Sequence, residues 1–245
     1  MKKFKKIIHF TIITIHNGNI SDLKKTIKSV DLQTVKPKKH LIISPILNID
    51  KIKKFRKKFR KFILGKDKSI YNAMNIGIKN TKNDFILFLN SGDTMFGNKT
   101  IKNIKNKIKE KKCYIFQTQL KYKNTIYTPK KSFFSSKNYY PHPSFIRPPE
   151  KKTKILFNEN FNILSDGIWM TKNIKKYGSV KKRDIISTHY LGGVSSKPNA
   201  HFLREKFRLS LLQGIKEFVK FLLFIIFTEK NYYKIIFKYK FNKKY

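Results

Sequence analysis

The predicted strand DFILFL at 84–89, with its apolar run from Phe85, constrains the fold of this chain more than any other feature. It is apolar on both faces of a strand, so it has to be covered on both faces, as the strands of parallel sheets are. Similar short runs stand at 10–15 and 41–43, and segments with apolar residues at helical spacing lie at 23–30 and 70–78. Strands that alternate with helices in this way predict βαβ units and an α/β fold with a parallel sheet.

The rest of the chain contains further expected elements. The basic segment from 49 to about 61 is interpreted as a helix, and strand-like pieces follow at 114–122 and 125–128. We expect one domain over residues 1–200, with helices flanking the sheet, and a helical extension over 201–245. The single cysteine, Cys113, lies in an apolar run and predicts a buried thiol in a reducing compartment.

The charge of the chain is extreme, with 56 Lys and Arg against 14 Asp and Glu and a net charge of +42. This charge keeps a basic nucleic-acid-binding protein open as an alternative. Lysine, however, is spread along the whole chain beside abundant Asn and Ile, a mixture that biased codon usage also produces. Arginine, the better residue for bidentate recognition of phosphate, stands at only six positions, and no base-reading motif is evident. We therefore expect no nucleic-acid partner.

Polar residues directly follow the strongest predicted strand, at Asn90-Ser91-Gly92-Asp93. In open α/β sheets, ligands bind beyond the carboxyl ends of the strands. A small turn there allows a ligand to approach the backbone, and the Asp93 carboxylate is suited to hold a hard cation that bridges phosphate oxygens. The alternative is an ordinary turn, in which Ser, Gly and Asp are common.

Two longer motifs include this turn and the helix before it: DKSIYNAMNIGI at 67–78 and NDFILFLNSGD at 83–93. Together they resemble the signature of family 2 glycosyltransferases of the GT-A fold, whose small bacterial members carry stretches such as GIYDAMNKGI and GDYILFLNSGD. Further pieces follow in the order of that family, and the resemblance spans residues 8–196. These pieces are HPSFI at 142–146, SDGIW at 165–169 and GGVS at 192–195.

The resemblance implies a GT-A, Rossmann-like α/β domain with a mixed, mainly parallel sheet. It also implies an inverting transfer of a sugar from a nucleotide-diphosphate sugar, here interpreted as a UDP-sugar, to a hydroxyl group. A divalent cation, Mg²⁺ or Mn²⁺, would bind the diphosphate, with Asp93 as its ligand and His189 as a second candidate. Asp166 would act as the catalytic base for the acceptor hydroxyl. The substrate-binding candidates are Thr14, His16, Asn17, Asp67, Tyr71, Asn75, Asn90, Ser91, Gly92 and His142.

Several of these assignments have a structural alternative. Asp67 and Asp166 are also suited to be helix N-caps, because a carboxylate accepts the free N–H groups of a first helical turn. His142 is also suited to pack within its loop, and His189 to lie in the core or on an edge strand.

The chain departs from the family pattern at three places. Ser44 replaces an Asp that relatives commonly offer to the nucleotide, and Asn72 replaces the Asp of the Tyr-Asp-Ala-Met-Asn element. The loop at 15–17 is one residue short. These changes leave open a catalytically inactive scaffold of the same family.

The residues after 200 predict a membrane contact. Residues 202–227 are interpreted as a helix whose end, FVKFLLFIIF at 218–227, is almost continuously apolar. Such a run spans about 15 Å, half of the roughly 30 Å hydrocarbon core, so it is too short to cross a bilayer. A basic, aromatic tail suited to an anionic interface follows at 230–240. The alternative is a terminal helix that packs on the domain or in a dimer.

These features together predict a location and an acceptor. We expect a bacterial enzyme of surface-polysaccharide or lipopolysaccharide assembly, cytoplasmic and peripheral on the inner face of the cytoplasmic membrane. Its acceptor would be a glycan or a lipid-linked saccharide.

Overall fold

The computed structural model describes residues 8–16, 18–45, 54–65, 69–129, 141–150, 154–191, 199–226, 231 and 241–244. The strands are β1 (Phe10–Ile15), β2 (Lys39–Ser44), β3 (Arg60–Leu64), β4 (Phe85–Phe88), β5 (Thr94–Met95), β6 (Cys113–Tyr122), β7 (Thr125–Pro129), β8 (Phe145–Arg147), β9 (Ser179–Tyr190) and β10 (Phe241–Lys244). The helices are α1 (Ile20–Asp31), α3 (Ile70–Lys79), α4 (Thr100–Lys107), the short 3-10 helix η2 (His142–Ser144), α5 (Ser165–Tyr177), α6 (Ala200–Leu209) and α7 (Leu211–Ile226).

The strands form one mixed sheet in the order β10-β7-β6-β8-β4-β1-β2-β3, and β9 pairs with β5 and β6. β3, β2, β1 and β4 are parallel neighbours, with Ile13 of β1 aligned with Leu41 of β2 and Phe88 of β4. β8 is antiparallel to β4 and to β6. The predicted α/β fold is confirmed, and the carboxyl ends of β1, β2 and β4 meet at one edge of the sheet.

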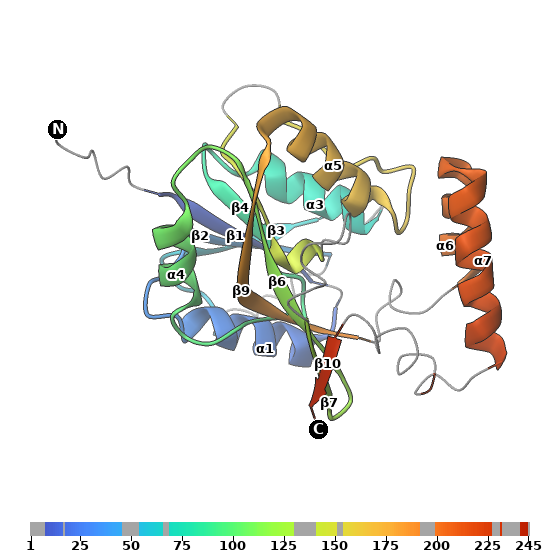
Figure 1. Cartoon of the computed structure of the whole chain (residues 1–245). Helices are drawn as coiled ribbons and strands as arrows, with labels where there is room; N and C mark the ends of the chain where they lie inside the picture. Colours follow the sequence, from blue (N-terminus) through green and yellow to red (C-terminus); the bar gives the residue numbers. More distant parts are fainter. Residues whose placement is uncertain are drawn as a thin grey trace.

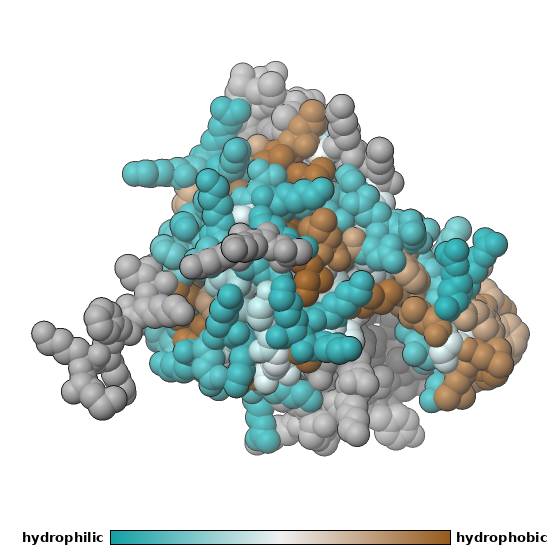
Figure 2. Space-filling view, turned by 90° about the horizontal axis from the view of Figure 1, so that it is seen from above, coloured by the Kyte–Doolittle hydropathy of each residue, from teal (hydrophilic) through white to brown (hydrophobic). Residues whose placement is uncertain are grey.

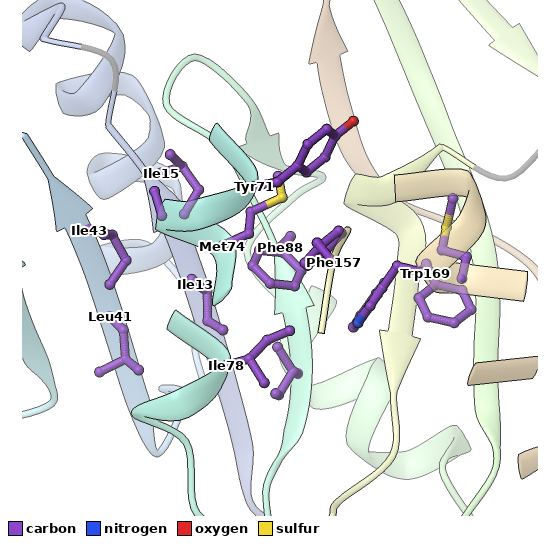
Figure 3. Packing of buried hydrophobic residues seen from close by; sticks show 14 of the residues in the cluster. Ile13, Ile15, Leu41, Ile43, Tyr71, Met74, Ile78, Phe88, Phe157 and Trp169 are labelled. Carbon is purple, nitrogen blue, oxygen red and sulfur yellow. The ribbon is translucent and has the colours of Figure 1, made fainter. Parts of the chain in front are cut away.

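Helices cover both faces of the sheet (Figure 1). On the face of α3 and α5, Ile13 and Phe88 belong to a buried cluster with Met74, Phe157 and Trp169, and the last two rings stack (Figure 3). On the face of α1 and α4, the neighbouring strand residues pack in a second cluster, which includes Ile12, Leu87, Val30, Ile101 and Ile104. Successive residues of β1 and β4 thus enter opposite clusters, which is why these strands are apolar throughout.

The expected helix from 49 to about 61 is wrong for the part of it that the structure describes. Residues 54–59 are mostly turns, and β3 begins at Arg60 and pairs in parallel with β2. Arg60 is buried because its guanidinium donates to Asp31 Oδ1 (2.5 Å) and to His40 Nδ1 (3.1 Å). A charge-assisted bond of this kind allows a basic segment to enter a sheet, and its partners stand far away in the sequence.

In the described residues after 199, α6 and α7 form a helical hairpin instead of the single expected helix. Ser210 has an extended backbone between α6 and α7. Gly214 allows the two helices to approach closely, since a Cβ at this position would overlap the Phe207 ring. β10 returns to the sheet and pairs antiparallel with β7. Among the described residues, no helix combines the length and the apolar character needed to cross a membrane.

Candidate active site

The turn at 90–93 lies where β4 ends, and α1 holds it in place. Thr26 of α1 donates its hydroxyl to the Asp93 carbonyl (2.7 Å) and accepts the N–H of Gly92 (3.0 Å). Gly92 has a φ of +100°, a conformation that strains other residues, so the glycine is required here. The turn therefore holds the Asp93 side chain, which is 5% exposed, at the carboxyl edge of the sheet.

The two carboxylate oxygens of Asp93 have different surroundings. Oδ1 accepts a hydrogen bond from His189 Nδ1 at 2.7 Å. Oδ2 is buried and has no hydrogen-bond partner among the described residues, and the same holds for the Ser91 hydroxyl and the Asn90 amide oxygen. Buried oxygens without a partner lower the stability of a fold, so a cluster of them indicates a place for a ligand.

His142 of η2 lies between two carboxylates. Its Nε2 is 3.9 Å from Asp93 Oδ2, and its Nδ1 is 3.8 Å from Asp166 Oδ2. The Asn90 amide nitrogen lies 3.1 Å from Nε2 and donates to it, which puts the ring proton on Nδ1, toward Asp166. Burial lowers the pKa of His142, although both carboxylates oppose this effect. The structure thus brings three predicted site residues together, in the order Asp93, His142 and Asp166.

Asp166 lies in the first turn of α5 and is partly exposed. Leu164 occupies the N-cap position, so the alternative of Asp166 as an N-cap is wrong. Its Oδ1 accepts the N–H of Gly167 (2.7 Å). Burial raises the pKa of Asp166 above its ordinary value, while His142 and backbone N–H groups partly offset the rise. A carboxylate that is easier to protonate than usual and open to solvent is suited to proton transfer.

His189 reaches Asp93 from β9, so it is neither isolated in the core nor on a free strand edge. Burial lowers the pKa of His189, but the charge and the hydrogen bond of Asp93 outweigh burial and leave the pKa raised. Because Nδ1 is committed to Asp93, the ring is suited to orient that carboxylate, as histidine and carboxylate partners do around metal sites. A direct role of His189 as a metal ligand stays a prediction.

Thr14 and His16, the candidates at the end of β1, are both buried but differ in their partners. The Thr14 hydroxyl donates to the Leu89 carbonyl (2.8 Å) and accepts from His40 Nε2 (2.9 Å), so it joins β1 to its two neighbours. His16 Nδ1 has no partner within the described residues, and burial lowers the pKa of this histidine. Only His16 has a free polar atom for a substrate.

Tyr71 and Asn75 of α3 bind the segment that leads to Asp166. The Tyr71 hydroxyl donates to the Ile163 carbonyl, and burial raises the pKa of this tyrosine. The Asn75 side chain accepts the N–H of Phe157 (2.8 Å) and donates to its carbonyl (3.1 Å). These contacts position the segment, and substrate binding by the two residues stays a prediction.

Asn72, one of the departures from the family pattern, has a partner. Its amide donates to Glu159 Oε2 (2.9 Å), and that of Asn75 donates to Glu159 Oε1 (2.8 Å). An Asp at position 72 would face Glu159 with a like charge, so Asn supports the local structure here. Two candidates, Asn17 and Asp67, lie outside the described residues, and Ser69 is the N-cap of α3.

Sequence reasoning missed two residues that reach the site from α6. The Glu205 carboxylate accepts the N–H groups of Ile163 (3.1 Å) and Leu164 (3.0 Å) as well as that of Asn162, just before α5. Lys206 lies close enough to Asp166 to favour its charged form. A lone acid in an otherwise apolar and basic helix is the only sequence signal for Glu205, and it does not name the partner.

The polar atoms around Asp93 fit a hard divalent cation in part. Asp93 Oδ2, the Ser91 hydroxyl and the Asn90 amide oxygen are the oxygen donors that Mg²⁺ and Mn²⁺ prefer. Within the described ranges, no three His, Cys, Asp or Glu residues gather as a complete metal site. A cation at Asp93 would therefore take most of its ligands from phosphate oxygens and water, as Mg²⁺ commonly does beside a diphosphate.

The amino-acid sequence matches the model of "Glycosyl transferase family 2" over residues 11–173, and no curated protein sequence matches it. Among solved structures, S. aureus TarS 1–349 in complex with UDP has a TM-score of 0.63 at 16% identity, covering 93% of this chain and 75% of that chain. The complex of TarS 1–349 with UDP-GlcNAc has a TM-score of 0.61 at 15% identity, covering 93% and 76%. The chain spans 45% of the longer S. aureus TarS structure.

A more distant similarity links the chain to the mannosyltransferase PcManGT from Pyrobaculum calidifontis in complex with GDP-Man and Mn²⁺. Its TM-score is 0.56 at 9% identity, covering 88% of this chain and 66% of that chain. The mixed sheet with helices on both faces thus has the GT-A fold of these glycosyltransferase structures. Since the family model covers most of the sequence, the chain belongs to glycosyltransferase family 2.

Proposed function

We propose that the protein transfers a sugar, with inversion, from a UDP-sugar to a hydroxyl group of a lipid-linked saccharide or surface glycan. The observation that carries this proposal is the line of polar groups from Asp93 through His142 to Asp166. It has a buried carboxylate suited to a cation at one end and a partly exposed carboxylate suited to proton transfer at the other. The TarS and PcManGT complexes with UDP, UDP-GlcNAc and GDP-Man support a nucleotide-sugar donor.

The donor side of the site is centred on Asp93. Its Oδ2 would hold Mg²⁺ or Mn²⁺, which when bound neutralises the charge of the departing diphosphate. His189 holds Oδ1 and so fixes the direction of the free oxygen. The Ser91 hydroxyl, the Asn90 amide oxygen and His16 Nδ1 are free to bind polar atoms of the donor, and Gly92 allows its close approach.

The acceptor side is centred on Asp166. This carboxylate accepts the proton of the acceptor hydroxyl, whose oxygen attacks the anomeric carbon of the donor. The bond between that carbon and the diphosphate oxygen breaks as the new bond forms, and the nucleoside diphosphate leaves with the electron pair. A single displacement of this kind inverts the anomeric centre. His142 directs its Nδ1 proton toward Asp166 and so favours the charged carboxylate.

The hairpin of α6 and α7 supports peripheral attachment to an anionic membrane. α7 buries Gly214 and Glu217 and turns apolar residues outward, the reverse of a helix on a soluble domain (Figure 2, brown at the right). We call this surface the outward apolar face, and it is rich enough in large side chains to enter the interface of a bilayer. It consists of the exposed apolar residues of α7, which recur at helical spacing: Leu211, Leu212, Ile215, Phe218, Val219, Leu222, Ile225 and Ile226.

The test of the proposed function is the turnover of a panel of UDP-sugars by the full chain with Mn²⁺ and a bacterial membrane extract as the source of acceptor. Release of UDP together with labelled sugar in the lipid or glycan fraction supports transfer. Asp93→Ala and Asp166→Ala should each abolish it. If both variants kept full transfer, the proposed mechanism would be wrong, whereas donor binding without turnover would indicate an inactive scaffold.

A further inference from the structure

A basic cavity lies against α6, outside the line from Asp93 to Asp166. Its volume is about 300 Å³, and it is lined by Asn162, His201, Arg204, Glu205 and Arg208. His201, Arg204 and Arg208 follow each other at spacings of three and four residues, so they share one face of α6. The two arginines are exposed, and the only carboxylate in the lining, Glu205, is committed to backbone N–H groups. Within the part of the chain that the structure describes, the two guanidinium groups therefore have no ion pair and are available to bind an anion.

The distribution of arginine makes this cavity different from the rest of the basic surface. Only six of the 56 basic residues are arginines, so a bias toward lysine does not explain two of them on one helical face. Arg60 and Arg147 are buried in ion pairs with Asp31 and Glu150. Arg204 and Arg208 instead face a cavity, and the planar guanidinium offers parallel N–H donors that match the oxygens of phosphate.

The cavity stands next to the acceptor side of the site. Glu205 binds the backbone of Ile163 and Leu164, which directly precede α5 and Asp166. The neighbouring residue of α6, Lys206, interacts with the Asp166 carboxylate. The same hairpin therefore carries the cavity on α6 and the outward apolar face on α7, and the two helices lie side by side (Figure 1).

We infer that Arg204 and Arg208 bind the phosphate group of a lipid, that of the lipid-linked acceptor at the bilayer surface. The inference rests on the proposed function, because it names the part of the acceptor that α6 recognises. Binding of a lipid phosphate explains why the guanidinium groups on α6, the outward apolar face on α7 and the proposed base on α5 occur on neighbouring elements. The hydroxyl of a saccharide that is attached to this phosphate would then lie toward Asp166.

The experiment compares the binding of the full chain to two kinds of vesicle in EDTA, which removes any bridging metal. Both contain phosphatidylcholine, and the anionic component is phosphatidic acid in one and oleate in the other, adjusted to the same surface charge. The native chain should bind the phosphate vesicles about fivefold more tightly, because charge-assisted hydrogen bonds add to the general attraction. Arg204→Gln/Arg208→Gln should lose this preference.

A matched control uses Lys24→Gln/Lys28→Gln on α1, which removes two exposed cations at the same spacing. This variant should keep the preference for phosphate, and circular dichroism checks that both variants are folded. A native chain without the preference, or an arginine variant that keeps it, overturns the inference. The proposed function fails separately, when no UDP-sugar of the panel is turned over, because vesicle binding requires no catalysis.

Discussion

At the scale of single residues, the raised pKa of Asp166 makes the acid limb of the rate profile a test of its role. As the proposed base, Asp166 would act only as a carboxylate, so transfer should fall as the pH falls through a value above 3.8, the ordinary pKa of this group. Asp166→Asn cannot accept the proton and should lower kcat by about 10²- to 10⁴-fold, without this acid limb in the residual rate. The measurement is kcat against pH for both proteins, with UDP affinity as the control that should not change.

His189 belongs to the same scale, because in the proposed mechanism its contact with Asp93 makes it a positioning residue. Loss of the hydrogen bond to Oδ1 in His189→Ala frees the carboxylate to turn, which should weaken Mn²⁺-dependent binding of UDP by about 10- to 100-fold. Calorimetric titration of UDP with and without Mn²⁺ measures this effect. His9→Ala, which alters an exposed histidine before β1, is the control and should bind UDP like the native chain. Equal affinities in the two variants would remove His189 from the site.

At the scale of elements, Glu205 joins the hairpin to the start of α5. Glu205→Ala leaves buried N–H groups of Ile163 and Leu164 without an acceptor, each at a cost of about 1–3 kcal/mol. We expect a lower melting temperature and a lower kcat, because the first turn of α5 carries Asp166, while UDP still binds at Asp93. Glu205→Gln keeps one acceptor oxygen, so its melting temperature and its kcat should fall less than those of Glu205→Ala. A Glu205→Ala protein with native stability and native kcat would contradict this role.

Elements were predictable from the sequence where local composition determines them. β1 and β4 are apolar because two helical layers cover them, and the sequence places both within a residue of their bounds. The interpretation of 49–61 as a helix failed because Arg60 enters β3 through bonds to Asp31 and His40, which stand on other elements. The first half of β9 was not expected, since its basic sequence, SVKKRD, gives no strand signal and depends on pairing with β6.

The same distinction holds for the candidate site: residues in local motifs could be predicted, and contacts between distant segments could not. Asp93 follows an apolar strand and belongs to a long motif, so its place at the carboxyl edge of the sheet could be expected. His142 and Asp166 belong to motifs too, but their approach to each other depends on how the second half of the chain packs. Glu205 could not be predicted, because its partners are backbone N–H groups about forty positions earlier, which carry no sequence signal.

At the scale of the whole molecule, the proposed membrane attachment combines the outward apolar face with the basic surface. Lysines near an anionic leaflet attract the chain over a distance set by salt, whereas apolar side chains add a contribution that salt does not screen. Shortening the chain near Ala200 would remove Glu205 and β10 along with this face, so substitutions on α7 test the membrane contact more directly.

The decisive variant is Leu212→Glu/Phe218→Glu, which changes two residues of the outward apolar face that are 61% and 44% exposed. Each loses the burial of a large side chain in the bilayer, so binding to anionic vesicles should fall by at least about tenfold per residue. Leu32→Glu/Leu64→Glu is the matched control, because these residues are 61% and 51% exposed on other elements and the change in charge is the same.

Vesicle flotation at low and high salt measures the binding. The α7 variant should lose binding at both salt concentrations, whereas the control should lose only a little, and only in a salt-sensitive way. An equal loss in the two variants would mean that charge alone brings the enzyme to the membrane.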